Sequence, residues 1–238
     1  MRDLRPARPT NFRGETIDNA RLDIAWVYTA NAKALSGPSA NAARRDSLVQ
    51  YQLLRVIEEK MVFGRAFYRY ADGLWASSND VRKVSSADRP TEVRKGERWI
   101  DIHLASQTLV AYEGDRPVYA TMVSTGRGRQ GTSTSTPIGV HRIWVKLVTS
   151  SMGNAGDPGG SDLYMIEDVP FVQFFHRGVG LHAAFWHDRF GTVRSHGCVN
   201  LSPYDAWWLF GFTSPRLPAG WRAVLPSDLG TGTVVRVR

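Results

Sequence analysis

Short segments in which apolar side chains recur at every second position dominate the chain after residue 98. The clearest, 99–104, places Ile100, Ile102 and Leu104 on one face of a strand. The other candidates are five to nine residues long and are separated by Gly, Pro, Ser and Thr: 108–112, 118–123, 140–148, 163–169, 179–183, 221–225 and 233–237. Many short strands with frequent turns predict a mostly β fold, arranged as an antiparallel β-sandwich or barrel.

One or two short helices are expected beside these strands. Ser202 as N-cap, Pro203 at the first helical position and Asp205 three residues after the cap predict a helix that continues through 206–210. The segment 151–161 contains four glycines, too many for a regular element, so we expect a surface loop or lid there.

The composition shifts over 85–98, a polar and charged stretch that we interpret as a linker. Before it, 66–70 and 71–75 are typical of two short strands around a glycine-containing turn, whereas 48–57 fits a strand or a helix. We therefore predict a small, mostly β N-terminal module at 1–90, with an SH3-like barrel as one candidate, and a second domain at 97–238. The module's role is open between packing and binding a polymer.

Composition and charge limit the classes of function. Hydrophobic residues make up 42% of the 238 and charged residues 22%, close to a globular average, which excludes a disordered, collagenous or coiled-coil chain. No apolar run approaches the roughly 18 residues that a membrane-spanning helix needs. The segment 1–13 has four arginines but no apolar stretch behind them, so no secretion signal is expected in this sequence.

Lys and Arg outnumber Asp and Glu by 30 to 22, a net charge of +8 that favours anionic partners. The basic residues are dispersed, and no motif combines them with aromatic residues. We therefore expect no nucleic-acid partner.

The most informative segment is 180–201, which holds the only cysteine, Cys198, and three of the six histidines. A thiol attacks an acyl carbon as thiolate, so it needs a base nearby, and His182 or His196 could supply it. Gly197 would let backbone amides approach the oxyanion formed on attack. Two alternatives are a buried inert thiol and a zinc site made by these histidines, His187 and the cysteine.

The segment Ser195-His196-Gly197-Cys198-Val199-Asn200-Leu201 resembles the catalytic motif of the YkuD-type L,D-transpeptidases. In that family an upstream histidine precedes the motif, and His182 is in that position. The segments 100–114, 123–126 and 136–139 are also similar to blocks of the family, so the resemblance covers about 98–238.

The resemblance implies that Cys198 is the nucleophile and that His182 is its general base, oriented by the backbone carbonyl of Ala183. It further implies an oxyanion hole of amides around His196, Gly197 and Cys198. Ser195 and Asn200 would shape the motif.

By the same resemblance, the chain would act on peptidoglycan stem tetrapeptides. It would form a thioester, release D-Ala and pass the acyl group to an amine, giving 3-3 crosslinks or another attached amine. With water as acceptor it would be an L,D-carboxypeptidase, and without catalysis a wall-binding protein. No metal or organic cofactor is expected. The function implies an extracytoplasmic location, in the periplasm or cell wall of a bacterium; the oligomeric state is left open.

Overall fold

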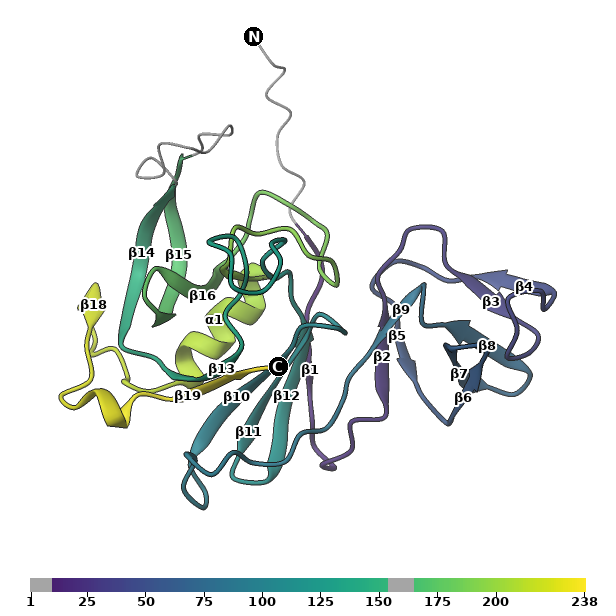
Figure 1. Cartoon of the computed structure of the whole chain (residues 1–238), viewed down its shortest axis with the longest axis horizontal. Coiled ribbons are helices and arrows are strands. Elements are labelled where there is room, and N and C mark those ends of the chain that lie inside the picture. The colour runs from purple at the N-terminus through teal and green to yellow at the C-terminus, as the bar shows by residue number, and fades with distance from the viewer. Residues whose placement is uncertain (1–9, 154–164) are drawn as a thin grey trace, which may run out of the picture.

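The computed structural model describes residues 10–153 and 165–238 and is built mainly from β-strands. Figure 1 shows two parts, a smaller one made of β2 to β9 and a larger one that contains the helix, β1 and β10 to β19. The prediction of a mostly β fold is confirmed. None of the helices in the described ranges has the length and apolar character to cross a membrane.

The smaller part, called the N-terminal module below, contains two sheets. One has the order β5 (Leu53–Arg55), β2 (Ile24–Val27), β9 (Val81–Lys83). The other has the order β4 (Arg44–Ser47), β3 (Lys33–Leu35), β8 (Leu74–Ser77), β7 (Arg65–Ala71), β6 (Glu58–Val62). The predicted hairpin at 66–75 is present as β7 and β8, and 48–57 contains β5 and no helix. An SH3-like identity stays a prediction.

The larger part has a six-stranded and a five-stranded sheet. The first has the order β1 (Glu15–Thr16), β12 (Arg116–Met122), β11 (Thr108–Glu113), β10 (Arg98–His103), β19 (Val234–Val237), β13 (Gly139–Arg142). The second has the order β17 (Val199–Leu201), β16 (Val179–Ala183), β15 (Met165–His176), β14 (Val145–Gly153), β18 (Ala223–Val224). Helix α1 (Pro203–Phe212) and a short 3-10 turn, η1 (Leu229–Thr231), complete it.

Two strand pairs depart from the antiparallel arrangement that we expected. β10 pairs with β19, and β16 with β17, in parallel. Parallel neighbours need a crossover connection, and 184–198 provides one between β16 and β17. The first three residues of the loop predicted at 151–161 belong instead to β14, which continues to Gly153. The rest of that segment, and the first two residues of the strand predicted at 163–169, lie outside the described residues.

An inter-sheet core fills the space between the two sheets of the larger part. It takes side chains from β10, β11, β16, β17, β19 and α1, among them Ile100, Leu109, Leu181, Val199 and Leu209. These five are fully buried. Burial fixes the register of β16 and β17, since a one-residue slip would turn their apolar side chains to the other face.

A second cluster, the back core, lies on the other face of the six-stranded sheet. It combines Trp99 and Val110 from the sheet with Ile24 and Trp26 from β2 of the module. β10 is therefore buried on both faces, not on one. The stretch predicted as a linker contributes Val93 to the same cluster, and Ala87 packs against it; 85–97 lacks regular structure but is packed.

Helix α1 begins as predicted, with the Ser202 hydroxyl accepting a hydrogen bond from the backbone N–H of Asp205 at 3.2 Å. The Asp205 carboxylate is fully buried and accepts from the Tyr119 hydroxyl at 2.6 Å and from the Gly14 N–H at 2.8 Å. Strand β1 pairs with β12 next to this contact. Residues 14–16 thus join the larger part, and the division at residue 90 stays a prediction.

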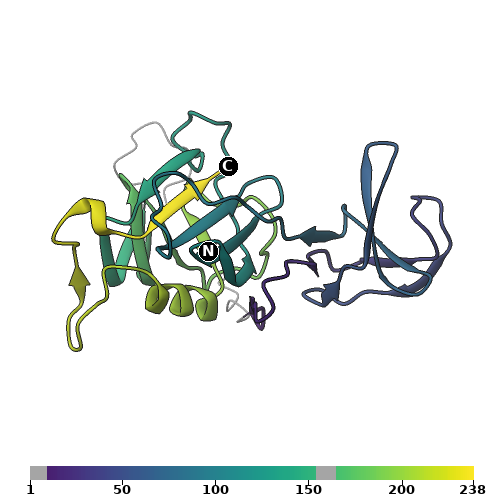
Figure 2. The ribbon, with the colours of Figure 1, turned by 90° about the horizontal axis from the view of Figure 1, so that it is seen from below.

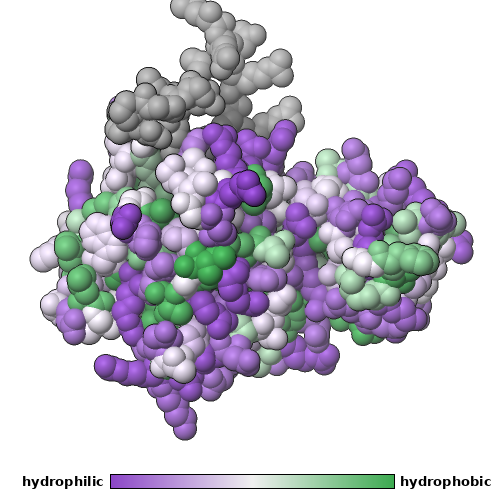
Figure 3. Space-filling view, in the orientation of Figure 1, coloured by the Kyte–Doolittle hydropathy of each residue, from purple (hydrophilic) through white to green (hydrophobic). Residues whose placement is uncertain are grey.

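The end of α1 contacts a lysine. Lys146 of β14 is fully buried, and its ammonium donates to the carbonyls of Phe210 at 2.6 Å and Thr213 at 2.9 Å. A cation at a helix C-terminus complements both the unsatisfied carbonyls and the dipole. Helix α1 runs along one face of the larger part, as Figure 2 shows, and the face seen in Figure 3 is largely hydrophilic.

Candidate active site

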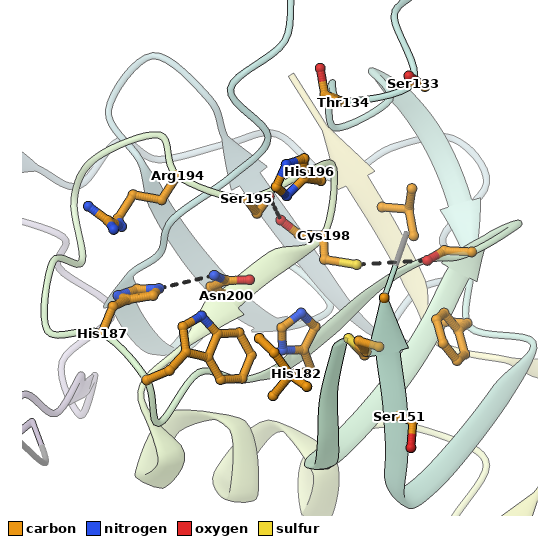
Figure 4. Close-up of a pocket in the computed structure, with 17 residues that line it drawn as sticks. Ser133, Thr134, Ser151, His182, His187, Arg194, Ser195, His196, Cys198 and Asn200 are labelled. Carbon is orange, nitrogen blue, oxygen red and sulfur yellow. Dashed lines mark hydrogen bonds between the residues drawn. The ribbon is translucent and has the colours of Figure 1, made fainter. Parts of the chain in front are cut away.

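Cys198 directly precedes β17, and β16 lies beside that strand in parallel register. His182 pairs with Asn200, and Leu181 with Val199. Leu181 and Val199 are fully buried in the inter-sheet core. Since successive side chains of a strand point to opposite faces, His182 and Asn200 face away from that core. Both line one pocket with Cys198, as Figure 4 shows.

The pocket has a volume of about 570 Å³. Its walls come from three places. The ends of β14 and β15 form one side, the loop between β16 and Ser195 forms another, and 133–134 close a third; the residues are Ser133, Thr134, Ser151, Met152, Gly153, Ile166, Phe174, Gly178, Val179, His182, Trp186, His187, Arg194, Ser195, His196, Cys198 and Asn200. The cysteine and the predicted base therefore open into one space large enough for a peptide segment.

His182 is held in one tautomer. Its Nδ1 lies 3.0 Å from the carbonyl oxygen of Ala183, and because a carbonyl only accepts, Nδ1 carries the hydrogen. Nε2 is then the atom that can take a proton. The ring of Trp186 stacks on the imidazole, with centroids 5.7 Å apart. Burial lowers the pKa of His182 to about 4, so the imidazole is neutral at pH 7.

Cys198 remains partly exposed to the pocket, with its Sγ 3.7 Å from the carbonyl oxygen of Gly178. The surrounding protein raises the pKa of the thiol by desolvation, and a hydrogen bond from the backbone of Gly180 offsets part of that rise. Thiol and imidazole are thus both neutral at rest. A thiolate has to form by proton transfer when the reaction begins.

Residues 123–126 hold the cysteine segment from the neighbouring sheet. Ser124 and Asn200 exchange two backbone hydrogen bonds of 3.0 and 2.9 Å, and the N–H of Ser195 donates to the carbonyl of Thr125 at 3.0 Å. The buried Gln107 side chain accepts in turn from the N–H of Thr125 at 2.9 Å. The separate sequence blocks that carried the resemblance therefore meet at this site.

Gly197 has a φ of +125°, which side-chain-bearing residues rarely adopt. Its carbonyl accepts from the Thr136 hydroxyl at 2.7 Å, and its N–H donates to the Ser195 hydroxyl at 3.1 Å. The same hydroxyl donates to the carbonyl of Cys198. The Gly197 amide is therefore engaged inside the motif. The oxyanion hole around His196, Gly197 and Cys198 stays a prediction, and the proposal below uses the amide of Cys198.

His196, the other candidate base, also lines the pocket. Its Nε2 accepts a hydrogen bond from the Arg127 guanidinium at 2.6 Å. A nitrogen engaged by a cation is a poor proton acceptor, and this favours His182 as the base.

His187 is a pocket residue whose position the sequence did not reveal. Its Nε2 lies 3.0 Å from Nδ2 of Asn200, and burial, followed by the charge of Arg194, lowers its pKa to about 4. Only its place between His182 and the motif could have pointed to it. As for the zinc alternative, no group of three or more His, Cys, Asp or Glu that could hold a metal occurs in 10–153 and 165–238.

Comparison with known proteins agrees with this geometry. The profile of the YkuD family, the L,D-transpeptidase catalytic domain, matches residues 97–237. The chain belongs to this family. No protein with a curated description matches it.

Several solved L,D-transpeptidases are similar in structure. One from Enterococcus faecium is 23% identical over 66% of this chain and 55% of its own, with a TM-score of 0.45. One from Stackebrandtia nassauensis is 26% identical over 61% and 57%, with a TM-score of 0.39. L,D-transpeptidase 3 from Mycobacterium tuberculosis is 18% identical over 73% and 78%, with a TM-score of 0.47. The chain thus spans little more than half of the first two.

Proposed function

We propose that the chain is an L,D-transpeptidase that acts on peptidoglycan stem tetrapeptides through a thioester on Cys198. The observation that carries the proposal is the placement of Cys198 and a buried, tautomer-fixed His182 in one pocket of a YkuD-family domain. A nucleophile, a base and a group that orients the base are the three parts that such acyl transfer requires.

The reaction has two halves. In the first, Nε2 of His182 takes the thiol proton while Sγ of Cys198 attacks the carbonyl of the third stem residue. The amide of Cys198 stabilises the oxyanion. The C–N bond to the fourth residue then breaks, and His182 returns the proton to the departing amine of D-Ala. In the second half an amine attacks the thioester, its proton passes to His182, and the thiol is restored.

The neutral resting pair suits this sequence. A protonated His182 could accept no proton, and the depressed pKa keeps the imidazole unprotonated well below pH 7. Because the pKa of Cys198 is raised, the thiol stays protonated in the resting protein. The thiolate forms only when substrate is bound and the proton moves to His182.

Charge supports an anionic substrate. Arg194 lines the pocket, and within the described residues no Asp or Glu does. Stem peptides carry free carboxylates, and the net charge of +8 favours an anionic wall polymer. An extracytoplasmic location, the absence of a required cofactor and stem peptides as the partner all rest on this proposed function.

Mass spectrometry of a purified stem tetrapeptide with excess D-amino acid tests the proposal. We expect exchange of the terminal D-Ala, or dimer formation, that is lost in Cys198→Ala and reduced at least a hundredfold in His182→Gln. His176→Gln, on the neighbouring strand β15, serves as the control histidine. Release of D-Ala alone would make the chain an L,D-carboxypeptidase. An unchanged tetrapeptide with wild-type protein, with or without lipid-linked acceptors, would favour a catalytically idle wall-binding protein.

A further inference from the structure

One wall of the active-site pocket is a loop that the N-terminal module contacts directly. This active-site loop, 184–194, connects β16 to the cysteine motif. It contributes Trp186, His187 and Arg194 to the pocket. Its far side faces the module, where three separate contacts hold it.

The first contact is apolar. Phe190 of the loop is fully buried in the back core, the cluster that also contains Trp26 of the module. The ring of Phe12 lies between the two parts, 5.8 Å from that of Phe190 and 4.8 Å from that of Tyr51.

The second contact is a hydrogen bond from a charged group. Nε of Arg82, on β9, donates to the carbonyl oxygen of Gly191 at 2.8 Å. Its guanidinium lies 3.8 Å from the centroid of the Tyr28 ring, which fixes the side chain. Gly191 has a φ of +92°, and a Cβ there would come within 2.8 Å of Tyr28. The loop backbone therefore approaches the module as closely as only glycine allows.

The third contact is a tyrosine hydroxyl. The Tyr51 hydroxyl of the module accepts a hydrogen bond from the N–H of Phe190 at 3.4 Å, and the Asp188 carboxylate lies near it. Burial, followed by the Asp188 carboxylate, raises the pKa of Tyr51, whereas the hydrogen bond from the Phe190 amide lowers it. Tyr51 has a φ of +69°, an uncommon conformation for a tyrosine. This strained backbone position coincides with the contact to the loop.

The active-site loop contacts His182 of β16 and Asn200 of β17, the paired residues whose side chains face the pocket. Trp186 stacks on His182 at 5.7 Å, and His187 lies 3.0 Å from the side chain of Asn200. Asn200 is two residues from Cys198. A shift of the loop by about 1 Å would move the ring that covers the base, and displacements of that size cost catalysis heavily.

We propose that Tyr51 and Arg82 are positioning residues for the acyl transfer, and that the N-terminal module sets the active-site loop against His182 and Asn200. The module acts through the loop and touches no reacting atom. The expected effect on kcat rests on the proposed function. The expected effect on the position of the loop does not depend on it.

A matched pair of double variants of the full chain tests it. Tyr51→Phe with Arg82→Gln removes the hydroxyl and the guanidinium that hold the loop. Tyr70→Phe with Arg69→Gln removes the same groups from β7, where Arg69 pairs with Glu58. Three quantities are measured: hydrogen exchange of peptides covering 184–194, the rate of Cys198 alkylation by iodoacetamide, and kcat and KM for the tetrapeptide.

We expect loop exchange in the first double variant to rise at least tenfold and kcat to fall about tenfold, with a smaller change in KM. Alkylation should slow severalfold because His182 is less well oriented. The control variant should match the wild type in all three. Arg82→Lys, which keeps a donor, should recover more kcat than Arg82→Gln. If the double variant unfolds, Tyr51→Phe alone, compared with Tyr70→Phe, carries the test.

Equal loop exchange and equal alkylation rates in the two double variants would overturn the positioning role. Neither measurement needs a peptide substrate. A wild-type protein that turns over no tetrapeptide would therefore overturn the proposed function alone, and the response of the loop to Tyr51 and Arg82 would still decide the inference.

Discussion

Acidification from pH 7 to pH 5 should destabilise the wild-type protein more than the His182→Gln variant. His182 is only 2% exposed, and burial lowers its pKa from 6.5 to about 4. The unfolded chain therefore binds a proton on this residue that the folded chain does not bind. Stability rises with pH wherever the unfolded state binds more protons, so stability is lost as the pH falls from 6.5 toward 4.

The two pKa values set the size of the effect. Between pH 7 and pH 5 the loss attributable to His182 is about 2 kcal/mol, since each pKa unit corresponds to about 1.4 kcal/mol. In a chain of this length that is a difference of about 4–8 °C in Tm. His187 also has a lowered pKa, but it is present in both proteins and largely cancels in the comparison.

Thermal unfolding at pH 7 and pH 5, followed by circular dichroism, measures the difference. Cys198→Ala is the control. It alters the same pocket but keeps the imidazole, and the raised pKa of the thiol places its titration outside this pH window. It should show the wild-type drop in Tm. If His182→Gln loses as much Tm as the wild type, the imidazole is not buried in its neutral form, and the account of the resting pair is wrong.

Three further outcomes are expected. The rate of Cys198 alkylation by iodoacetamide should still be rising at pH 8.5, because the thiol pKa is raised; a plateau below pH 7 would indicate a preformed thiolate. Gly197→Ala should lower kcat at least tenfold and Tm by several degrees, because a φ of +125° costs about 1–3 kcal/mol for alanine; retained activity would show that the segment adapts. Lys146→Met should lower stability by about 2 kcal/mol by leaving two carbonyls of α1 unpaired, with kcat unchanged, as urea unfolding and turnover assays can check.

Local signals in the sequence were sufficient for most strands and for the start of α1. Ser202 caps the helix as its spacing with Asp205 predicted. The segments of β10, β11 and β12 were found because strand periodicity is encoded by adjacent residues. The motif around Cys198 is likewise contiguous, and His182 lies in the same short segment of the sequence.

Features made by contacts between distant segments were not predictable. Nothing near Lys146 indicates that its ammonium ends beneath the last turn of a helix some sixty positions later. Glu15–Thr16 is too short to show a period, although it forms β1. The engagement of the Gly197 amide depends on the rotamer of Ser195. Tyr51 lies in a segment that fitted two kinds of secondary structure.

The position of β19 has a consequence for how this protein is made. Val234–Val237 lies inside the six-stranded sheet, between β10 and β13. The ribosome makes β10 some 130 residues before it makes β19. Strand β10 therefore cannot pair with β19 until residue 237 has been synthesised. A chain interrupted before that point exposes two unpaired strand edges, which favours aggregation. Loss of a few residues from β19 is therefore expected to cause misfolding of the larger part and not a mild local change.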